Sequence, residues 1–573
     1  MNRLLLYVHF NKFNQVSDHV VYQLSRLRPL FSNVIFISNS ELSDEDCTRL
    51  SNLKLYDDLI QRQNEGFDFA AWRDGMTFVG FDHLSDYDSV TLMNDTCFGP
   101  LYDLAPYYEK YEADRSIDFW GITNHVAHEK YPEHIQSYFM SFKNEVLQSR
   151  NFQDFWKKVK SFTDVQDVID HYETQNTEIL MQAGFKGQTI LDTTLLDATQ
   201  MTYPDFSFWN PTAIVQNKVP FIKVKAIAAH QAITPYVLDY IRKNTDYPIE
   251  LITGHMSMID LPDYPYLLSE KFIDKTCQYT GVSERVAVHF HVFYVDLVAD
   301  FLAEFLKFEF NYDLLITTDT IAKKEEIQTI LSAEKMTAEI FVTGNIGRDI
   351  YPMLKIKDKI SQYDIIGHFH TKKSKEADFF AGESWRNELI DMLIKPANSL
   401  IQNLVDDKNL GVIIADIPTF FRFNKIVNAN NEASMAPIMN ELWHKMNFKK
   451  EIDFSQMDTF TMSYGTFVWF KYQAYQSLFD LEIKDTDIPK EPLPQNTILH
   501  AIERLFIYIA WEHNYDFKIS QNEIKMTAFV DNKVLNTKMG FPNEQMGLKK
   551  SFRYIFSRFK LEIKKIFSIF KGR

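Results

Sequence analysis

The sequence predicts an α/β protein built from two copies of one nucleotide-binding fold, each with a mostly parallel sheet. The pattern Asn-x-Gly-x-Asp occurs at residues 64–68 and again at residues 345–349. Each copy is followed, after a helix-length interval, by an apolar run that ends in polar residues, at 87–96 and 363–374. Because Asn and Gly tolerate positive φ and Asp is a good N-cap, each copy predicts a tight turn that opens a helix. At 573 residues the chain is also too long for one hydrophobic core, which favours two large domains.

The first half of the chain alternates strand and helix patterns. Residues 3–10 predict a strand, a helical pattern follows from about 16 to 30, and residues 34–39 predict a second buried strand. The turn at Asn64 with its helix, and the strand that ends at Asn94 and Asp95, complete a parallel βαβαβ unit. Further strands are predicted at 119–124, 135–142 and 220–224, with helices at about 144–160 and 172–184. We assign residues 1–245 to this first domain.

The pattern restarts after a segment with poor periodicity. Residues 246–284 are rich in Pro, Tyr and Asp and are interpreted as a linker or adapter. Residues 285–540 then repeat the order of elements and are assigned to a second domain. The strands are expected at 285–292, 312–319, 338–343, 363–374, 411–415 and 464–471, with helices at about 294–308 and 497–511.

Composition excludes several classes of protein. The chain is 45% hydrophobic and 24% charged, as soluble globular proteins are. No apolar run approaches the roughly 20 residues that span a bilayer, and the first ten residues turn polar too early for a signal peptide. Three widely spaced cysteines offer neither a disulfide framework nor a Cys-based metal site. A net charge of −16 argues against nucleic acid as the main partner, and we expect a cytoplasmic protein.

The C-terminal segment has the opposite charge. Residues 547–573 contain nine Lys or Arg and one Glu. Their aromatic and aliphatic residues recur at spacings of three and four, which predicts an amphipathic helix that lies on an anionic membrane surface. We assign residues 541–573 to this tail. The alternative is a helix folded back on the acidic body.

Several motifs resemble one known family. The motifs at 464–471 and 500–506 resemble the carboxyl half of the rhamnan synthesis protein F family. Further matching motifs lie, in order, at 94–100, 136–140, 220–223, 344–350, 370–374 and 384–386. The resemblance runs from about residue 3 to 530. It implies two tandem GT-A-like domains that transfer L-rhamnose from dTDP-rhamnose to a lipid-linked polyrhamnose, in bacterial cell-wall polysaccharide synthesis at the inner face of the membrane.

The resemblance also suggests a metal site in the first domain. Asn94, Asp95 and Thr96 stand where GT-A glycosyltransferases place a metal-binding Asp-x-Asp. Such a pair lets Mg²⁺ or Mn²⁺ neutralise the charge that builds on the leaving diphosphate. Only Asp95 remains here, so the metal would depend on one carboxylate with water and phosphate oxygens. The alternative is a strand-end Asp that caps a turn.

The second domain carries basic residues at the corresponding place. His370, Lys372 and Lys373 follow the matching strand, and a pair of ammonium groups can neutralise a diphosphate without a metal. We therefore expect this domain to be metal-independent; a solvated lysine pair is the alternative. The candidate donor- and phosphate-binding residues are Asn64, Gly66, Asp68, Asn94, Asp95, Asn345, Gly347, Arg348, Asp349, His370, Lys372, Lys373 and Arg386.

Glycosyl transfer needs a base for the acceptor hydroxyl. Glu503, one helical turn after His500, fits this need in the second domain, and Glu173 is the candidate in the first. A Glu on an exposed helix face is the alternative for each. His9 and His291 lie near the ends of the opening strands, where they would contact the nucleotide base or simply pack in the core.

The sequence leaves the number of working sites open. Both domains could be catalytic, or one could hold the acceptor glycan. A different sugar or glycerol phosphate could be transferred, and a non-catalytic glycan-binding scaffold of degenerate transferase domains is the competing class. The retained carboxylates favour an enzyme.

Overall fold

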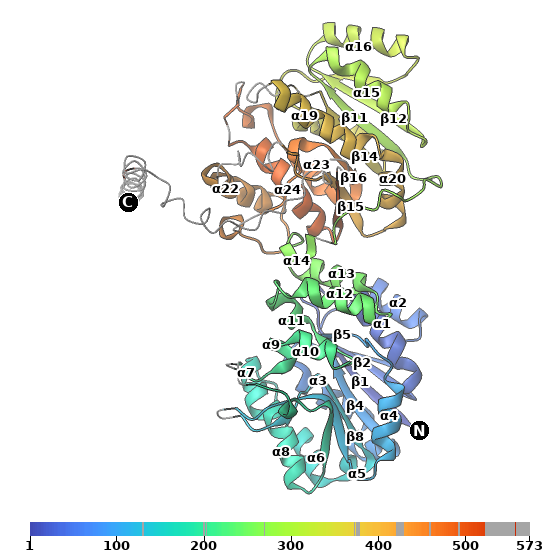
Figure 1. Ribbon diagram of the computed structural model, residues 1–573, viewed down its shortest axis with the longest axis vertical. Coiled ribbons are helices and arrows are strands. Elements are labelled where there is room, and N and C mark those ends of the chain that lie inside the picture. The colour runs from blue at the N-terminus through green and yellow to red at the C-terminus, as the bar shows by residue number, and fades with distance from the viewer. Residues whose placement is uncertain are drawn as a thin grey trace. The chain divides into compact units, whose positions relative to one another are not determined.

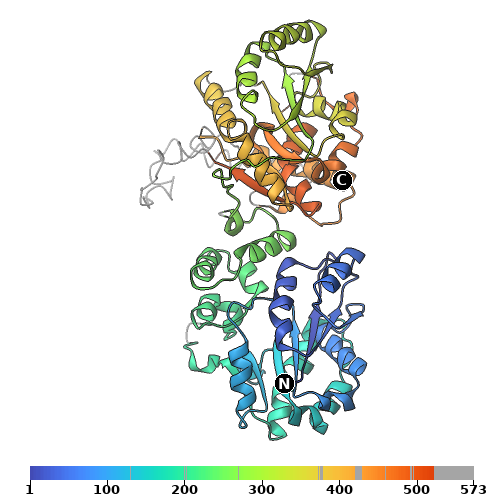
Figure 2. The ribbon, with the colours of Figure 1, turned by 90° about the vertical axis from the view of Figure 1, so that its right-hand side faces the viewer.

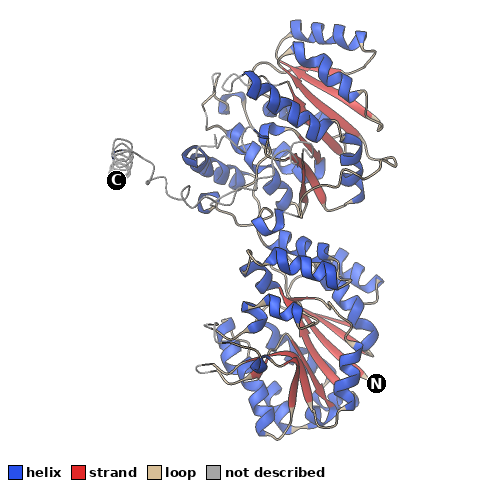
Figure 3. Cartoon of the chain, in the orientation of Figure 1, coloured by secondary structure: helices blue, strands red, loops and turns tan. Residues whose placement is uncertain are grey.

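The computed structural model describes residues 1–521, apart from 129–130, 199–200, 202, 269, 372, 374–378, 420–428, 458–459, 491–492 and 495, together with Phe556. Residues 1–520 form one compact unit. The predicted amphipathic tail lies outside the described residues except for Phe556. The architecture is mixed α/β, with two largely parallel sheets whose strands are drawn in red in Figure 3.

The first sheet has the strand order β3-β2-β1-β4-β8-β6-β7, with β9 paired to β6. Strands β1 to β4 are parallel, whereas β8 runs antiparallel to both of its neighbours. The bounds are β1 (Arg3–His9), β2 (Asn33–Ser38), β3 (Asp58–Gln61), β4 (Ser89–Asn94), β6 (Phe119–His125), β7 (His134–Ile135), β8 (Phe139–Lys143) and β9 (Gly187–Leu191). A separate two-stranded sheet joins β5 (Cys97–Phe98) and β10 (Ile222–Lys223).

The second sheet repeats this topology. Its order is β13-β12-β11-β14-β16-β15-β17, with β16 antiparallel to both neighbours and β17 parallel to β15. The bounds are β11 (Val286–Val292), β12 (Tyr312–Thr318), β13 (Glu339–Val342), β14 (Ile365–His370), β15 (Leu410–Ala415), β16 (Val468–Lys471) and β17 (Asp516–Ser520). Position for position, β1, β2, β3, β4, β8, β6 and β9 correspond to β11, β12, β13, β14, β16, β15 and β17. The order of elements predicted from the sequence therefore recurs in space.

Helices cover both faces of each sheet (Figures 1 and 2). Around the first sheet lie α1 (Asp18–Leu27), α2 (Asp44–Asn52), α3 (Phe67–Val79), α4 (Ala105–Ala113), α5 (Asn144–Gln148), α6 (Arg150–Lys157), α7 (Val165–Val168), α8 (Thr174–Gln182), α9 (Phe206–Trp209), α10 (Pro211–Gln216), α11 (Val224–Ala229) and α12 (Thr234–Asn244). One face packs on α1, α2 and α4, the other on α3, α6 and α8. Since both faces are buried, the strands are continuous apolar runs.

The second sheet is covered in the same way. Its helices are α15 (Val298–Phe305), α16 (Ile321–Ala333), α17 (Ile350–Lys355), α18 (Lys357–Ile360), α19 (Phe379–Leu389), α20 (Ala397–Asp406), α22 (Ala429–Lys445), α23 (Gln476–Asp480) and α24 (Ile498–Glu512). One core contains side chains of α15, α16 and α20, and the other contains side chains of α17, α22 and α24.

The two Asn-x-Gly-x-Asp turns have the same backbone. Gly66 has φ 73° and Phe67 φ 53°, and Gly347 has φ 79° and Arg348 φ 52°. Two successive left-handed residues reverse the chain before α3 and α17, and glycine adopts the first of them without strain. The predicted tight turn is confirmed in both copies. The expectation that the aspartate caps the helix is wrong for Asp68, because Gly66 is the N-cap of α3 and Asp68 is a residue of its first turn.

Three local expectations differ from the structure. The helix expected at 144–160 is divided into α5 and α6, since Ser149 has an extended backbone and caps α6. In the strand expected at 464–471, residues Tyr464–Thr466 form a helical turn and only Val468–Lys471 pair with the sheet. The segment interpreted as an irregular linker contains α13 (Ile249–Ile259) and α14 (Pro265–Leu268).

Candidate functional site

The carboxyl ends of the parallel strands define an equivalent position in each sheet. The backbone N–H of Asp95 donates to the carbonyl of Val8 at 3.1 Å, and the N–H of Thr371 donates to the carbonyl of His291 at 3.0 Å. The start of the same strand pair matches too, because Asp88 bonds to Asn2 and Asp364 to Arg285. Asp95 and Thr371 therefore occupy equivalent positions. Where the first half has Asp95, the only carboxylate of the predicted Asp-x-Asp site, the second half has the hydroxyl of Thr371.

In the first half the turn and the strand end meet. Asn94 Nδ2 donates to Asp68 Oδ2 at 2.7 Å, and Thr96 donates through N and Oγ1 to Asn94 Oδ1. Asp95 Oδ2 accepts from the backbone N–H of Phe10 at 3.1 Å. Asp68, Asn94 and Asp95, which the sequence predicts as one donor site, are thus brought together at the edge of the sheet.

Both carboxyl groups hold protons more strongly than usual. Burial raises the pKa of Asp95 to about 8, and the charge of Asp68 adds to this rise. Burial likewise raises the pKa of Asp68 to about 6, against the stabilising hydrogen bond from Asn94. Burial disfavours the charged form of both carboxyl groups, a cost that a bound cation would offset.

The two candidate bases occupy equivalent positions. Glu173 lies in the helical turn Ile169–Glu173 before α8, and its Oε1 accepts the backbone N–H of Ser137 at 3.2 Å. Glu503 lies on α24, and its Oε1 accepts the backbone N–H of Gly465 at 2.7 Å. Ser137 and Gly465 correspond, because Lys143 pairs with Ser89 as Lys471 pairs with Ile365.

In the second half the turn aspartate meets histidines. Asp349 Oδ2 lies 3.4 Å from His368 Nε2 and 3.8 Å from His370 Nε2, and it accepts a hydrogen bond from Thr466 Oγ1. His370 Nε2 in turn donates to the carbonyl of Gly465 at 2.7 Å. Although burial disfavours its charge, the two imidazoles and the hydroxyl hold the pKa of Asp349 well below its usual range. Asp349, His370 and Glu503 are therefore joined through the Gly465–Thr466 turn.

The opening-strand histidines are packed among polar groups. His9 contacts Ser38 Oγ at 3.2 Å and lies 3.8 Å from Asp95 Oδ2, and burial lowers its pKa to about 4. His291 contacts Thr317 Oγ1 at 3.0 Å, and burial lowers its pKa to about 3. Both side chains are neutral at pH 7, which fits hydrogen bonding better than charge neutralisation.

The other predicted residues are more dispersed. Lys373 forms an ion pair with Asp296 and lies over the ring of Tyr294, whereas Lys372 falls outside the described residues. Arg386 lies on α19, 4.0 Å from Glu383. His500 Nδ1 contacts Thr497 Oγ1 at 2.7 Å. Asn345 and Arg348 are exposed, Asn64 is half-buried, and Gly66 and Gly347 are buried.

Sequence reasoning missed a polar position after the second strand of each sheet. Asn39 follows β2, and its buried Nδ2 has no hydrogen-bond partner among the described residues, while its Oδ1 accepts from Arg62. Asp319 follows β12 at the equivalent position, and its carboxylate meets Lys323 Nζ at 2.9 Å. Polar residues at the ends of predicted strands were the available signal.

Among the described residues, no group of three His, Cys, Asp or Glu side chains is arranged to hold a metal ion. Asp68 and Asp95 are the pair whose chemistry fits a divalent cation, with other ligands from outside the protein. Within the same residues, no helix is long and apolar enough to cross a membrane.

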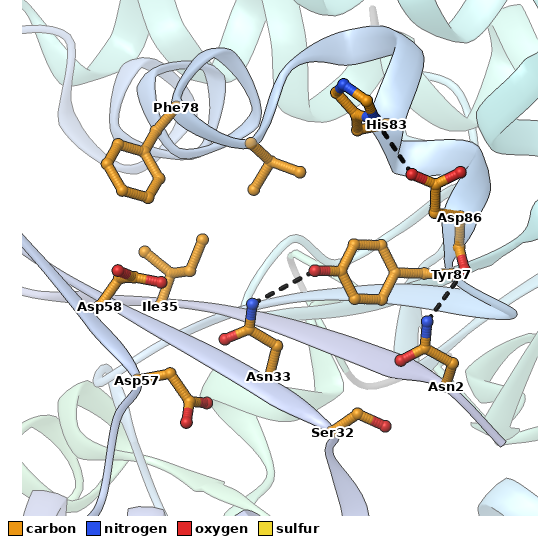
Figure 4. Close-up of a pocket in the computed structure, with 11 residues that line it drawn as sticks. Asn2, Ser32, Asn33, Ile35, Asp57, Asp58, Phe78, His83, Asp86 and Tyr87 are labelled. Carbon is orange, nitrogen blue, oxygen red and sulfur yellow. Dashed lines mark hydrogen bonds and ion pairs between the residues drawn. The ribbon is translucent and has the colours of Figure 1, made fainter.

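A pocket of about 550 Å³ lies at the opposite edge of the first sheet (Figure 4). Its lining comes from the starts of β1, β2 and β3 and from the end of α3, and it includes Asn33, Phe78 and Tyr87. Asn33 Nδ2 donates to Tyr87 Oη at 3.2 Å. None of the predicted site residues lines this pocket, so it is separate from the carboxyl-end site.

Comparison with known proteins places the chain in a family. The model of the rhamnan synthesis protein F family matches residues 34–515. The chain is 28% identical over 170 residues to uncharacterized protein y4gN of Sinorhizobium fredii, covering 29% of this chain and 43% of the relative. It is 24% identical over 245 residues to uncharacterized protein WxcX of Xanthomonas campestris, covering 40% of this chain and 32% of the relative. The chain thus spans less than half the length of these relatives.

Solved structures are similar at a lower level. The glycosyltransferase GlyE of Streptococcus pneumoniae has a TM-score of 0.28 and 11% identity, covering 65% of this chain and 87% of that one. The mannosyltransferase PcManGT of Pyrobaculum calidifontis, in complex with GDP-Man and Mn²⁺, has a TM-score of 0.25 and 10% identity, covering 52% of this chain and 68% of that one.

The chain belongs to the rhamnan synthesis protein F family, whose model spans most of its length. The family expected from the motifs is confirmed.

Proposed function

We propose that the chain transfers L-rhamnose from dTDP-rhamnose to a lipid-linked polyrhamnose, through two tandem GT-A-like halves that both have a transfer site. The observation that carries this proposal is the recurrence of one constellation at equivalent positions. A turn aspartate, a strand-end polar residue and a helix glutamate that accepts a backbone N–H occur in both sheets. Family membership supports the sugar and the polymer.

The first site combines donor binding with a cation. Asp95 and Asp68 would hold Mg²⁺ or Mn²⁺, which neutralises charge on the diphosphate of the donor when bound. Asn94 fixes Asp68 by the 2.7 Å hydrogen bond, and His9 lies beside Asp95. The unpartnered amide of Asn39 offers a donor to the nucleotide at the end of β2.

The second site functions without a cation. Thr371 stands where the first half has the carboxylate of Asp95. The carboxylate of Asp349 lies 3.4 Å from His368 and 3.8 Å from His370 and accepts a hydrogen bond from Thr466. Lys373 and the exposed Arg348 supply positive charge near the phosphates, although Lys373 must exchange its partner Asp296 to do so.

Glu173 and Glu503 act as the bases for the acceptor hydroxyl. Each uses one carboxylate oxygen to accept the backbone N–H of a residue that precedes an antiparallel strand. This hydrogen bond fixes the carboxylate, so its second oxygen has a defined position from which it can take the proton of the acceptor hydroxyl. In the second half Arg504 lies 3.6 Å from Glu503 Oε2, so its guanidinium places a positive charge beside this carboxylate.

The proposed location is the inner face of the cell membrane. A lipid-linked acceptor is held at the bilayer, and the basic residues of 547–573 would bring the sheet edges to it. The enzyme is otherwise expected in the cytoplasm, where nucleotide sugars are used.

The test compares products of the whole chain and two conservative variants. Purified protein is incubated with dTDP-rhamnose, Mn²⁺ or EDTA, and a lipid-linked rhamnose acceptor, and products are separated by mass and linkage. Glu173→Gln and Glu503→Gln keep the oxygen that accepts the backbone N–H, so the fold should be unchanged. We expect each to lose about 10²- to 10⁴-fold in kcat for one linkage.

Three results would contradict the proposal. A single linkage lost by only one variant would make the other half a binding module. Equal activity in EDTA and Mn²⁺ for both linkages would remove the cation from the first site. Saturable dTDP-rhamnose binding with no product would favour a scaffold.

A further inference from the structure

A chain of buried polar side chains runs through the second sheet. His289 Nδ1 lies 2.8 Å from His368 Nδ1, and their rings are stacked with centroids 4.9 Å apart. His289 Nε2 and His291 Nδ1 both contact Thr317 Oγ1, at 2.9 and 3.0 Å. His368 Nε2 reaches Asp349 Oδ2 at 3.4 Å. Four hydrogen bonds therefore connect Asp349 to His291 through the interior of the sheet.

The first sheet has apolar residues at the same positions. By the shared register, His289, His368 and Thr317 correspond to Leu6, Leu92 and Ile37, all of which are fully buried. An apolar core is therefore sufficient to build this sheet. Buried polar groups are costly unless each is hydrogen-bonded, so the chain of histidines needs an explanation beyond folding.

The carboxylate fixes the direction of every hydrogen bond. Asp349 is ionised and only accepts, so His368 carries its proton on Nε2 and offers a bare Nδ1. His289 must then donate from Nδ1, which leaves its Nε2 to accept the Thr317 hydroxyl proton. The Thr317 oxygen accepts from Nδ1 of His291. One ordered array of hydrogen bonds results.

The open end of the array is Nε2 of His291. This nitrogen is bare in the order just derived, because His291 is bonded to Thr317 through its other ring nitrogen. His291 is the penultimate residue of β11, its backbone carbonyl accepts from Thr371, and only 5% of the residue is exposed. The array therefore ends near the carboxyl end of β11, at the residue whose backbone bonds to Thr371.

We propose that this array takes up one proton at His291 when a nucleoside diphosphate binds the second half, and that the added positive charge comes to rest on His368, beside the ionised Asp349. The inference rests on the proposed function, because the diphosphate is the ligand of that site. It assigns to the array the charge balance that a cation supplies in the first half.

The transfer balances at every atom. A proton binds Nε2 of His291, and the Nδ1 proton of that ring passes to Thr317 Oγ1. The hydroxyl proton of Thr317 passes to His289 Nε2, and the Nδ1 proton of His289 passes to His368 Nδ1. His368 then carries a proton on both ring nitrogens and keeps its Nε2–H on Asp349 Oδ2, which stays ionised. His291 presents an N–H donor instead of a bare nitrogen.

The consequence suits an anionic ligand. Before uptake, the site offers a carboxylate and a bare nitrogen, which both repel phosphate oxygens. After uptake, the positive charge of His368 offsets the carboxylate, and His291 offers an N–H donor. The charged or titratable groups that face the array are Asp349, Asp319 and His370, and Lys323 pairs with Asp319. Of these, Asp349 is the one that the array reaches by hydrogen bonds.

The test uses the residues of the first half as replacements. In His289→Leu/His368→Leu, the array is interrupted and the site gains the leucine pair that Leu6 and Leu92 form in the other sheet. Binding of dTDP to the whole protein is measured by calorimetry in buffers of different ionisation enthalpy at pH 7.5. Native protein should take up about one more proton per chain than the variant, and the variant should bind dTDP more weakly with a steeper loss at high pH.

A matched control separates the array from histidine content. His125 and His134 are also stacked, at 5.2 Å, but lie in the first half. His125→Leu/His134→Leu should leave the additional proton uptake unchanged. Thermal unfolding of both double variants reports whether they fold. Equal proton uptake in native protein and His289→Leu/His368→Leu, with the fold intact, overturns the proposal while the proposed function stands.

A second measurement decides the case in which dTDP does not bind. Such a result would contradict the proposed donor, and inorganic pyrophosphate is then the probe. Selective ¹⁵N labelling of histidine reports which ring nitrogen carries the proton. On addition of pyrophosphate or on acidification, His289 and His291 should exchange their protonated nitrogens, and His368 should become protonated on both nitrogens, in one step. Independent or absent changes would overturn the relay.

Discussion

Asp95 is the carboxyl group of the first site whose pKa is raised more than that of Asp68. Its side chain is 12% exposed, its hydrogen-bond donor is a backbone N–H, and its pKa is raised to about 8 by burial. A group with a folded pKa above its unfolded value stabilises the protein below the unfolded pKa and loses this contribution as the pH rises through the folded pKa. For Asp95 the window runs from about pH 4 to about 8.

Asp95→Asn removes this pH dependence, because the amide stays neutral and its oxygen can still accept from Phe10. We expect the variant to match the native protein near pH 4 and to exceed its free energy of unfolding by on the order of 5 kcal/mol at pH 8, because folding raises the pKa of Asp95 from 3.8 to about 8 and each pKa unit corresponds to about 1.4 kcal/mol. Urea unfolding at pH 4, 6 and 8 measures the difference. Mn²⁺ should stabilise the native protein and not the variant, in proportion to its binding. A constant difference across this pH range would mean that Asp95 is ionised in the folded protein.

The individual residues show what sequence could and could not supply. Asp68, Asn94 and Asp95 were predicted as neighbours, because polar residues at parallel strand ends share one edge. The joining of Asp349 to Glu503 through Gly465 depends on the register of an antiparallel strand, which no local pattern reveals. Whether a strand-end lysine is free also depends on distant partners, as the pairing of Lys373 with Asp296 illustrates.

At the level of elements, the Asn-x-Gly-x-Asp turn determines where the site residues lie. A Cβ on Gly66 would come within 2.6 Å of the Ser161 Cα and of the Ala70 Cβ, and φ is 73°. Gly66→Ala should therefore destabilise the protein by about 1–3 kcal/mol and displace Asp68 from Asn94. The measurements are urea unfolding and the Mn²⁺ dependence of the first-half linkage.

Gly254→Ala is the matched control for this turn. Gly254 lies within α13, where an added Cβ meets nothing within 4 Å, so alanine should stabilise by about 0.5–1 kcal/mol. If both substitutions change stability equally, the turn is not under steric constraint.

Element boundaries were predicted well where the hydrophobic periodicity was strong. The periodic runs of β1, β2, α1 and α24 correspond to the expected ranges, since both sheet faces and one helix face are buried. The prediction was weaker where capping decides the structure. Ser149 divides the expected long helix. The left-handed Gly465 lies in the helical turn that replaces the first part of the strand expected at 464–471, so β16 begins only at Val468.

For the whole molecule, the segment 246–284 contributes to the second sheet. Lys271 forms a buried ion pair with Asp516 at 2.5 Å, and the N–H of Ile273 donates to Ile519 of β17. Trp511 Nε1 also donates to the Ser257 carbonyl at 2.6 Å. The linker assignment and its boundaries stay a prediction, but these contacts tie its carboxyl half to the fold that follows.

A fragment of residues 246–521 should be more stable than a fragment of residues 285–521. The shorter fragment leaves Asp516 unpaired and removes the chain that pairs with β17, so we expect a loss of at least about 3 kcal/mol. Urea midpoints of the two fragments measure this difference. Lys271→Met in the longer fragment separates the ion pair from the backbone pairing. Equal midpoints would show that the second sheet folds independently of the segment.

The duplication of strand order on one polypeptide has a consequence for the polymer. Two separate enzymes can vary in abundance, so the ratio of their products follows gene expression. Here both sheets are translated together in equal number. If each half forms one linkage, the composition of the glycan is determined by relative turnover and by donor supply. A cell could then change it only by altering the donor supply or the chemistry of one half.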